Sequence, residues 1–191
     1  MHKASVDNRT RVLNAARELL QTRGINAFSH RDLAERVGIK SSSVHYYFPT
    51  KEDLGVALIR SYQHELTEFF EATATLPTVI ERLTRFCGLF EGTAKAGGRL
   101  CLAGMLASDF ATLGPSLQSE VRAFFQLVEA WLAAQAALSK PERSPAANAD
   151  LSQLAFSLLE GVLLSARVFD DPDRTRRAAR HIQQLFGSPS V

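Results

Sequence analysis

Residues 29–48 have the sequence SHRDLAERVGIKSSSVHYYF, and this stretch decides the fold at the front of the chain. Ser29 with Asp32 three residues later has the pattern of a capping box, which predicts a short helix that ends at Gly38. A tight turn follows, and Ser41 is expected to cap a second short helix that runs to Tyr47. Two short helices joined by a glycine-containing turn are typical of a helix-turn-helix, whose second helix enters the major groove of DNA.

The second of these helices carries side chains that suit contact with DNA. It offers hydroxyl and imidazole groups without any carboxylate, and such groups donate hydrogen bonds to phosphate oxygens. The side chains concerned are Ser41, Ser42, Ser43, His45, Tyr46 and Tyr47. The helix has no Arg, Asn or Gln for bidentate contacts, so base recognition would depend on serine, thymine methyl groups or DNA shape. A serine-rich surface helix without a DNA role is the alternative interpretation.

The whole chain is expected to be helical. Apolar residues recur at spacings of three and four almost throughout, and no Asn-Gly or Asp-Gly hairpin signal interrupts them. We therefore expect an all-α fold of about nine helices, with a three-helix DNA-binding domain at residues 1–50 and a helical ligand-binding and dimerisation domain at residues 51–191. Thr50 with Asp53 predicts the cap of a long fourth helix that reaches about Thr73. An exposed loop is expected at residues 141–149, before an eighth helix at about 150–169.

Composition narrows the classes of protein to which the chain can belong. Its 191 residues are 46% hydrophobic, which is enough to bury a core and excludes a disordered tail. Residues 1–50 hold eight Lys or Arg against four Asp or Glu, so a polyanion such as DNA would meet the front of the chain. Cys87 and Cys101 have neither metal-ligand nor disulfide-framework spacing, and the polar N-terminus lacks a signal peptide. We expect a soluble cytoplasmic protein without metal, cofactor or membrane partner.

Six segments follow one another in a fixed order along the front quarter of the chain. They are RVLNAARELL (11–20), RG (23–24), FS (28–29), LA (33–34), VGI (37–39) and VHYYFPTKEDL (44–54). Together they resemble the DNA-binding domain of the TetR/AcrR family of repressors. The resemblance implies a three-helix DNA-binding domain, an all-α C-terminal domain that differs between members, and a homodimer on a palindromic operator.

The resemblance also implies DNA contacts at particular positions. Ser41, Ser42 and Ser43 match the start of the recognition helix, and His45, Tyr46 and Tyr47 match an aromatic cluster that contacts phosphate, as does Lys51. The family usually has Tyr where this chain has His45, so that contact would depend on imidazole protonation. Ser29 and Arg31 are further candidates because the positive end of a helix dipole lies there. For Arg31, a solvated surface charge is the alternative.

Aromatic and other large apolar side chains are concentrated behind the front region. They could line an effector cavity between helices, although stripes at helical spacing are more often ordinary core. The residues concerned are Phe86, Phe90, Met105, Phe110, Phe124, Phe125, Trp131 and Phe156. Few charges lie among them, with Arg99, Asp109 and Glu160 the nearest, so an apolar or weakly polar effector is expected.

Cys101 is a separate effector candidate. The segment GGRLCL (97–102) resembles a glycine-then-cysteine helix start in one branch of the family, some of whose members sense electrophiles or oxidants. A thiol beside a helix N-terminus and Arg99 would have its thiolate favoured. The alternative is that Cys101 packs as a small hydrophobic residue, which is also the expectation for Cys87.

Together these patterns predict a ligand-responsive transcriptional regulator, a repressor that binds its operator as a homodimer through the eighth and ninth helices. It would leave the operator when a small apolar or electrophilic effector binds. One alternative is an architectural DNA-binding protein that responds to no ligand. Another is a cysteine-dependent enzyme, against which the five histidines argue because none lies near a predicted pocket. We expect no enzymatic activity.

Overall fold

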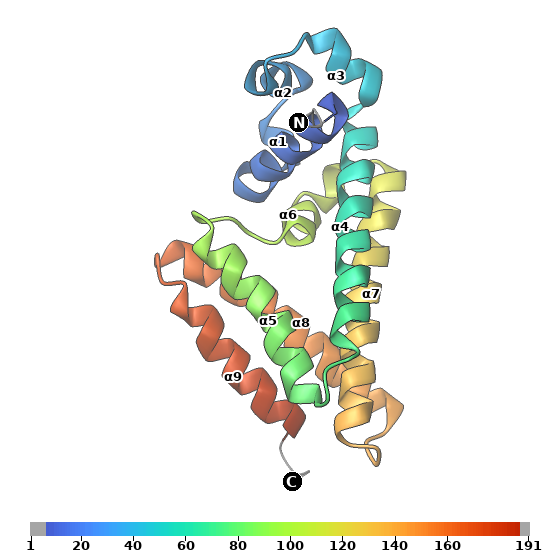
Figure 1. Ribbon diagram of the computed structural model, residues 1–191, viewed down its shortest axis with the longest axis vertical. Helices are drawn as coiled ribbons and strands as arrows, with labels where there is room; N and C mark the ends of the chain where they lie inside the picture. Colours follow the sequence, from blue (N-terminus) through green and yellow to red (C-terminus); the bar gives the residue numbers. More distant parts are fainter. Residues whose placement is uncertain (1–6, 188–191) are drawn as a thin grey trace, which may run out of the picture. The chain divides into compact units, whose positions relative to one another are not determined.

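The structure is a computed structural model that describes residues 7–187. This part of the chain contains nine α-helices, two 3₁₀ turns and no strand (Figure 1). The α-helices are α1 Asn8–Arg23, α2 His30–Val37, α3 Ser41–Tyr47, α4 Lys51–Thr73, α5 Val79–Lys95, α6 Leu102–Ser108, α7 Pro115–Ser139, α8 Pro145–Val168 and α9 Asp173–Gly187. The all-α prediction is therefore confirmed.

Two of the predicted helix starts are confirmed by their hydrogen bonds. Ser29 and Asp32 form a reciprocal capping box at the start of α2. Thr50 and Asp53 form the same pair at the start of α4, where the Asp53 N–H donates to Thr50 Oγ1 at 3.0 Å. These caps satisfy backbone donors that a helix start would otherwise leave without partners.

The prediction that Ser41 caps α3 is wrong. The N-cap is Lys40, whose backbone is extended and whose side chain makes no capping hydrogen bond, and Ser41 is already the first helical residue. The α3 helix therefore lacks a side-chain cap and depends on packing for its stability.

The predicted loop at residues 141–149 is too long, because α8 starts at Pro145. Ser144 caps this helix by accepting a hydrogen bond from the Ala147 N–H at 3.2 Å. Proline suits the first helical turn because its fixed φ is helical and its missing N–H is not needed there. The Ser144-Pro145 pair could have indicated this earlier start of α8 from the sequence.

By packing, the described chain divides into two compact units. The first unit contains the described residues up to Tyr62 together with Leu102–Arg122. The second contains Gln63–Cys101 together with the described residues from Ala123 onward. The front region thus packs with the first half of α4, with α6 and with the start of α7. The boundary at residue 50 between a DNA-binding domain and a ligand-binding and dimerisation domain stays a prediction.

Two hydrogen bonds attach the segment after α6 to the turn that follows α1. Asp109 Oδ2 accepts from the Ile25 N–H at 3.2 Å. Asn26 Nδ2 donates to Thr112 Oγ1 at 2.9 Å. More than eighty residues separate the partners, so these contacts bring a distant part of the chain into the first unit.

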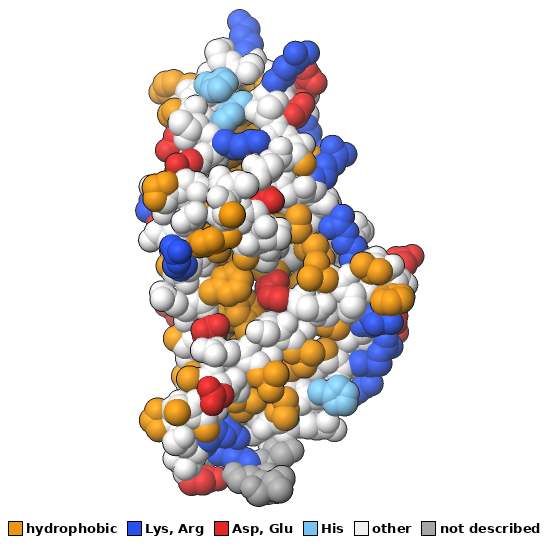
Figure 2. All heavy atoms as spheres, turned by 180° about the vertical axis from the view of Figure 1, so that it is seen from behind, with side chains coloured by type: hydrophobic (Ala, Val, Ile, Leu, Met, Phe, Trp, Pro, Cys, Tyr) orange, Lys and Arg blue, Asp and Glu red, His pale blue; other side chains and the backbone are white. Residues whose placement is uncertain are grey.

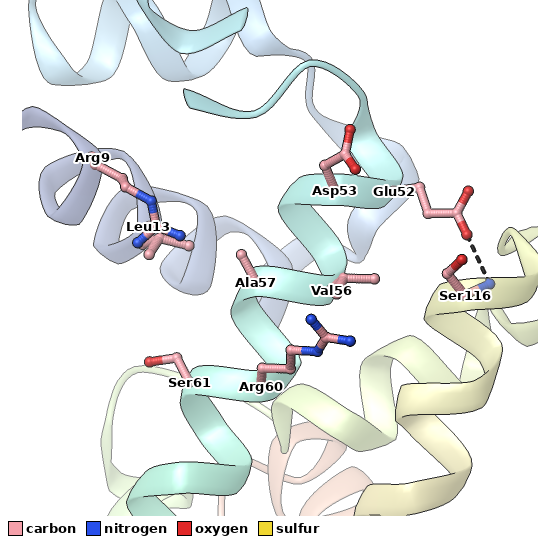
Figure 3. Close-up of a pocket in the computed structure, with 9 residues that line it drawn as sticks. All are labelled: Arg9, Leu13, Glu52, Asp53, Val56, Ala57, Arg60, Ser61 and Ser116. Atoms are coloured by element: carbon pink, nitrogen blue, oxygen red, sulfur yellow. Dashed lines mark hydrogen bonds between the residues drawn. The ribbon is translucent and has the colours of Figure 1, made fainter. Parts of the chain in front are cut away.

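The start of α4 also caps α7. Glu52 Oε1 accepts hydrogen bonds from the N–H groups of Ser116 at 3.0 Å and Leu117 at 3.3 Å, in the first turn of α7 (Figure 3). A carboxylate at this position both pairs the free N–H groups and complements the helix dipole. Beside it lies an open depression of about 750 Å³, lined by the residues Arg9, Leu13, Glu52, Asp53, Val56, Ala57, Arg60, Ser61 and Ser116.

In the second unit, α5, α8 and α9 pack against one another. Their shared core is made of large apolar side chains with little or no exposure, including Leu83, Phe86, Leu159, Leu163, Ile182 and Phe186. The α8 helix is long and apolar enough to span a membrane by length and composition, a test that core helices of water-soluble proteins also pass. The outer side of α8 still exposes several leucines.

Gly38, which ends α2, provides a test of the turn before α3. Its φ of 74° is left-handed, although no atom lies within 4 Å of the position of an added Cβ. Gly38→Ala should therefore lower the free energy of unfolding by about 1–2 kcal/mol through backbone strain alone. Gly88→Ala is the control, because Gly88 lies within α5 and has equal space. It should leave stability unchanged or raise it by up to about 1 kcal/mol. Urea denaturation followed by circular dichroism measures both, and equal losses would contradict this account.

Candidate nucleic-acid interface

Two buried apolar side chains hold α3 in place. Val44 has no exposed surface and Phe48 is 2% exposed, and α2 contributes Leu33 and Val37 to the same core. Arg11 on α1 donates from Nη2 to the Val37 carbonyl oxygen at 2.6 Å, which fixes the C-terminal end of α2. These contacts determine which side of α3 faces inward.

The opposite side of α3 faces outward and carries the predicted DNA-contact groups. The Tyr46 side chain is 82% exposed, and Ser42 and His45 are exposed as well. Ser41, Ser43 and Tyr47 are half-buried. The Tyr46 and Tyr47 rings lie 5.4 Å apart, edge to face. The structure therefore presents hydroxyl and imidazole groups together on one exposed helix face.

His30, at the start of α2, was not among the predicted residues. Its ring stacks on that of His45, with ring centroids 4.4 Å apart and planes at 14°. His30 Nε2 donates to the Phe48 carbonyl oxygen at 2.9 Å, and His45 Nδ1 donates to the Pro49 carbonyl oxygen at 3.4 Å. Figure 2 shows histidine side chains at the surface with Lys and Arg side chains nearby. No local pattern indicates this pair, because its members are fifteen residues apart on different helices.

Positive groups surround this face within the first unit. Lys51 Nζ lies 5.5 Å from the centre of the Phe28 ring, and the Arg9 guanidinium lies 5.2 Å from that of Phe48. These cation–π contacts hold the stems against buried rings while the charges stay available to an anion. Lys51 is the first residue of α4, which is where the sequence analysis placed it.

Ser29 and Arg31 fit a phosphate contact less well than the α3 residues. The backbone N–H and the hydroxyl of Ser29 both donate to Asp32 Oδ2, at 2.7 and 2.8 Å, so both of its donors are used in the cap. Arg31 Nε donates to Glu35 at 3.1 Å, and both side chains are largely exposed. Such a surface pair is weak, so Arg31 could exchange Glu35 for a phosphate.

Comparison with known proteins agrees with this geometry. A sequence model described as bacterial regulatory proteins, tetR family, matches residues 12–58, from α1 into α4. The solved structure of a TetR transcriptional regulator from Legionella pneumophila is 32% identical, covers 95% of this chain and 98% of its own, and superposes with a TM-score of 0.89. The chain belongs to the TetR family of bacterial regulatory proteins.

Other solved structures share the fold at lower identity. A TetR-family regulator from Agrobacterium tumefaciens is 27% identical, with a TM-score of 0.85 over 93% of this chain and 96% of its own. The reduced form of NemR from Escherichia coli is 20% identical, with a TM-score of 0.76 over 97% of this chain and 100% of its own. A comparison with curated protein sequences finds no significant match. TetR-family regulators bind DNA.

The predicted effector residues of this TetR-family chain are divided between the two units. Met105 and Phe110 belong to the first unit, where the Arg122 guanidinium lies 4.8 Å from the Phe110 ring. Six others belong to the second unit, namely Phe86, Phe90, Cys101, Phe124, Trp131 and Phe156, and so does Phe125. The structure therefore does not bring all of these residues together within one unit.

Ring contacts link four of these six residues into what we call the aromatic cluster, which consists of Phe86, Phe90, Trp131 and Phe156. Its ring centroids lie 5.5 Å apart for Phe86 and Phe90, 5.1 Å for Phe86 and Trp131, and 6.5 Å for Phe90 and Phe156. Phe70 on α4, which was not predicted, stacks on Trp131 at 4.5 Å. Its burial follows the four-residue spacing from Leu66, which could have indicated it. An effector role for this cluster stays a prediction, since the same contacts make ordinary core.

The two cysteines have different surroundings. Burial raises the pKa of the Cys87 thiol to about 12, so it stays protonated in the core of α5. Cys101 is 3% exposed, directly precedes α6, and donates a hydrogen bond to the Glu160 carboxylate. Among residues 7–187, no three His, Cys, Asp or Glu side chains are grouped as a metal site requires.

The stacked histidines lead to a prediction about pH. Burial, together with the nearby His45 and Lys51, lowers the pKa of His30 below its usual 6.5, against the opposing effect of the Phe48 carbonyl. Its neutral form therefore stabilises the fold above pH 6.5, and this contribution is lost as the pH falls through the lowered value. His45→Gln should raise the pKa of His30, measured by NMR titration of the imidazole protons. His64→Gln, on the exposed side of α4, should leave it unchanged. An unaltered His30 titration in the His45 variant would contradict the coupling.

Proposed function

We propose that this TetR-family chain is a transcriptional repressor that binds a palindromic operator as a homodimer and releases it when a small molecule binds the second unit. The observation that carries the proposal is the outward face of α3, fixed by Val44 and Phe48 and bearing hydroxyl and imidazole donors. Two such helices would need to lie roughly 34–36 Å apart to enter successive major grooves.

DNA contact is proposed for Ser41, Ser42, Ser43, His45, Tyr46, Tyr47 and Lys51. The serines are small enough to let the helix backbone approach the base edges, while the tyrosines and Lys51 reach the phosphates. His30 joins this set as a residue that positions His45 through their stacked rings. Arg31 is a weaker candidate, and Ser29 acts mainly as the cap of α2.

Dimerisation is proposed through α8 and α9. Large apolar side chains remain exposed on the outer side of these helices: Leu154 at 54%, Leu158 at 36%, Leu164 at 57%, Val168 at 77% and Leu185 at 42%. Gly161 lies among them with no atom within 4 Å of an added Cβ, which leaves room for a second helix to approach. Two copies of this surface would form a four-helix interface that removes it from water.

The connection from effector to operator is proposed to run through α6. This helix starts directly after Cys101 and ends just before Asp109, whose carboxylate holds the Ile25 N–H after α1. A shift of α6 would therefore act on the turn that supports α2. A coupling of roughly 1–3 kcal/mol per effector is enough to weaken operator binding about 5- to 150-fold.

For the effector, an apolar compound against the aromatic cluster fits the predicted residues. An electrophile acting on Cys101 stays a second prediction, although the thiol is buried and faces a carboxylate, which does not favour a thiolate. Electrophile-induced release that is equal in wild type and Cys101→Ser would show that the thiol is structural. Operator binding that responds to no small molecule would instead favour an architectural DNA-binding protein.

The proposed operator contacts can be tested by alanine variants, with a control that removes the same charge from the second unit. Lys51→Ala should weaken operator binding about 2- to 12-fold and reduce the salt dependence by about one phosphate contact. Tyr46→Ala should weaken it by a similar factor. Arg85→Ala is the control, because it removes one exposed positive charge from α5 in the second unit. Fluorescence anisotropy with operator DNA at several salt concentrations measures these effects, with dimerisation checked by ultracentrifugation. Unchanged affinity in both Lys51 and Tyr46 variants would refute this placement of the recognition helix.

The dimer interface can be tested by placing charges on α8. Leu158→Glu combined with Leu164→Glu should convert dimer to monomer, because carboxylates would have to be buried between apolar helices. Leu138→Glu is the control, since Leu138 is 59% exposed on α7. Light scattering coupled to size-exclusion chromatography measures the mass. A double variant that remains dimeric would place the interface elsewhere.

A further inference from the structure

Glu160 on α8 has a buried carboxylate oxygen with no hydrogen-bond partner. Its Oε1 atom has almost no contact with solvent and nothing donates to it. The other influence on the group is Cys101, whose thiol donates a hydrogen bond to the carboxylate. Leaving a buried acceptor of this kind unpaired costs stability, so it calls for an explanation.

The surroundings of Glu160 are apolar. Phe156 lies one turn earlier on the same side of α8, and its ring is 5.0 Å from Phe125 and 6.5 Å from Phe90 on α5. Cys101 and Phe156 are 3% and 2% exposed. The Glu160 residue as a whole is only half-buried, so the carboxyl group lies just beneath the surface of the second unit.

No cation compensates this carboxylate within the described chain. Burial raises the pKa of Glu160 from 4.5 to about 7, the Cys101 hydrogen bond opposes the rise, and no basic side chain contributes. The sequence placed Glu160 near the apolar residues but predicted an apolar effector. Glu160 is thus an unpaired acid one helical turn from the buried Phe156 ring.

We propose that Glu160 anchors a protonated organic amine, whose N–H donates to Oε1 while its hydrocarbon part packs on the Phe156 side of the aromatic cluster. This inference rests on the proposed effector response and names the chemical class of its ligand. A metal ion fits poorly, because one carboxylate and one thiol supply too few ligands among the described residues. A neutral donor would form a hydrogen bond to Oε1 but leave the negative charge of the carboxylate uncompensated. An ammonium group supplies both the hydrogen bond and the positive charge. Aromatic faces attract such a cation as well.

The experiment compares amines with alcohols of the same carbon skeleton. Phenethylamine and naphthylmethylamine are titrated into the full-length protein by isothermal titration calorimetry, beside phenethyl alcohol and naphthalenemethanol. The wild-type protein should bind each amine about ten- to a hundredfold more tightly than its alcohol. In buffers of different ionisation enthalpy at neutral pH, amine binding should release protons, because the cation converts the acid form of Glu160 to carboxylate.

Three variants define the anchor. Glu160→Gln keeps the shape of the side chain and should reduce the preference for amine over alcohol to less than about threefold. Glu71→Gln removes the same charge from an exposed position of the second unit and should keep the wild-type preference. Cys101→Ser retains a donor to Glu160 and should also keep it. Glu160→Gln should unfold at or above the wild-type temperature at pH 8, because an acid with a raised pKa destabilises the fold as the pH rises from 4.5 through about 7.

The outcomes separate this inference from the proposed function. Equal binding of amine and alcohol by the wild type, or an amine preference that survives in Glu160→Gln, would overturn the amine site. Operator binding is measured independently by anisotropy without added compound. If the wild-type protein does not bind operator DNA, the repressor proposal is wrong, while the amine preference would still stand.

Discussion

The burial of Val44 and Phe48 is the constraint on which the rest of the first unit depends. The α3 helix has seven residues and no side-chain cap, and a helix of that length is unstable by itself in water. It persists because these two side chains are enclosed by α1 and α2. The same contacts fix its rotation, so that Tyr46 and His45 point outward. Stability and presentation of the DNA-facing groups therefore have one physical cause.

The first unit is completed by residues from far along the chain. Two carboxylates hold these residues in place. Asp109 accepts a hydrogen bond from the Ile25 N–H, and Glu52 accepts one from a backbone N–H in the first turn of α7. Both occupy backbone donors that helix ends and turns leave unpaired, which makes these contacts directional. Glu52 directly follows Lys51, so a proposed phosphate contact and a helix cap are adjacent on α4. A movement of α6 or of the start of α7 would therefore shift the groups proposed to contact DNA.

The second unit combines a well-packed core with two features that packing within one chain leaves unresolved. One is the row of exposed leucines on α8, which is costly in water and suits a second copy of the same surface. The other is Glu160, whose buried oxygen has no donor. Both are positions where a monomer without ligand is less stable than it could be. Binding free energy can be gained at such positions, which links the assembly and effector proposals.

Local sequence patterns were enough to predict the helices and the class of the fold. Capping pairs such as Thr50 with Asp53 and glycines such as Gly38 act over a few residues, so local chemistry was enough to place them. It was also enough to indicate the outward groups of α3, since burial of Val44 and Phe48 follows from helical spacing. The predictions were wrong at two helix starts. Ser41 is the first residue of α3 and not its cap, and α8 starts at Pro145, earlier than predicted. Only the tertiary structure decided that His30 stacks on His45, that residues 102–122 join the front of the chain, and that Glu160 is buried without a cation. These outcomes depend on which distant groups meet, and a pattern of neighbouring residues carries no information about the dielectric surroundings that packing creates.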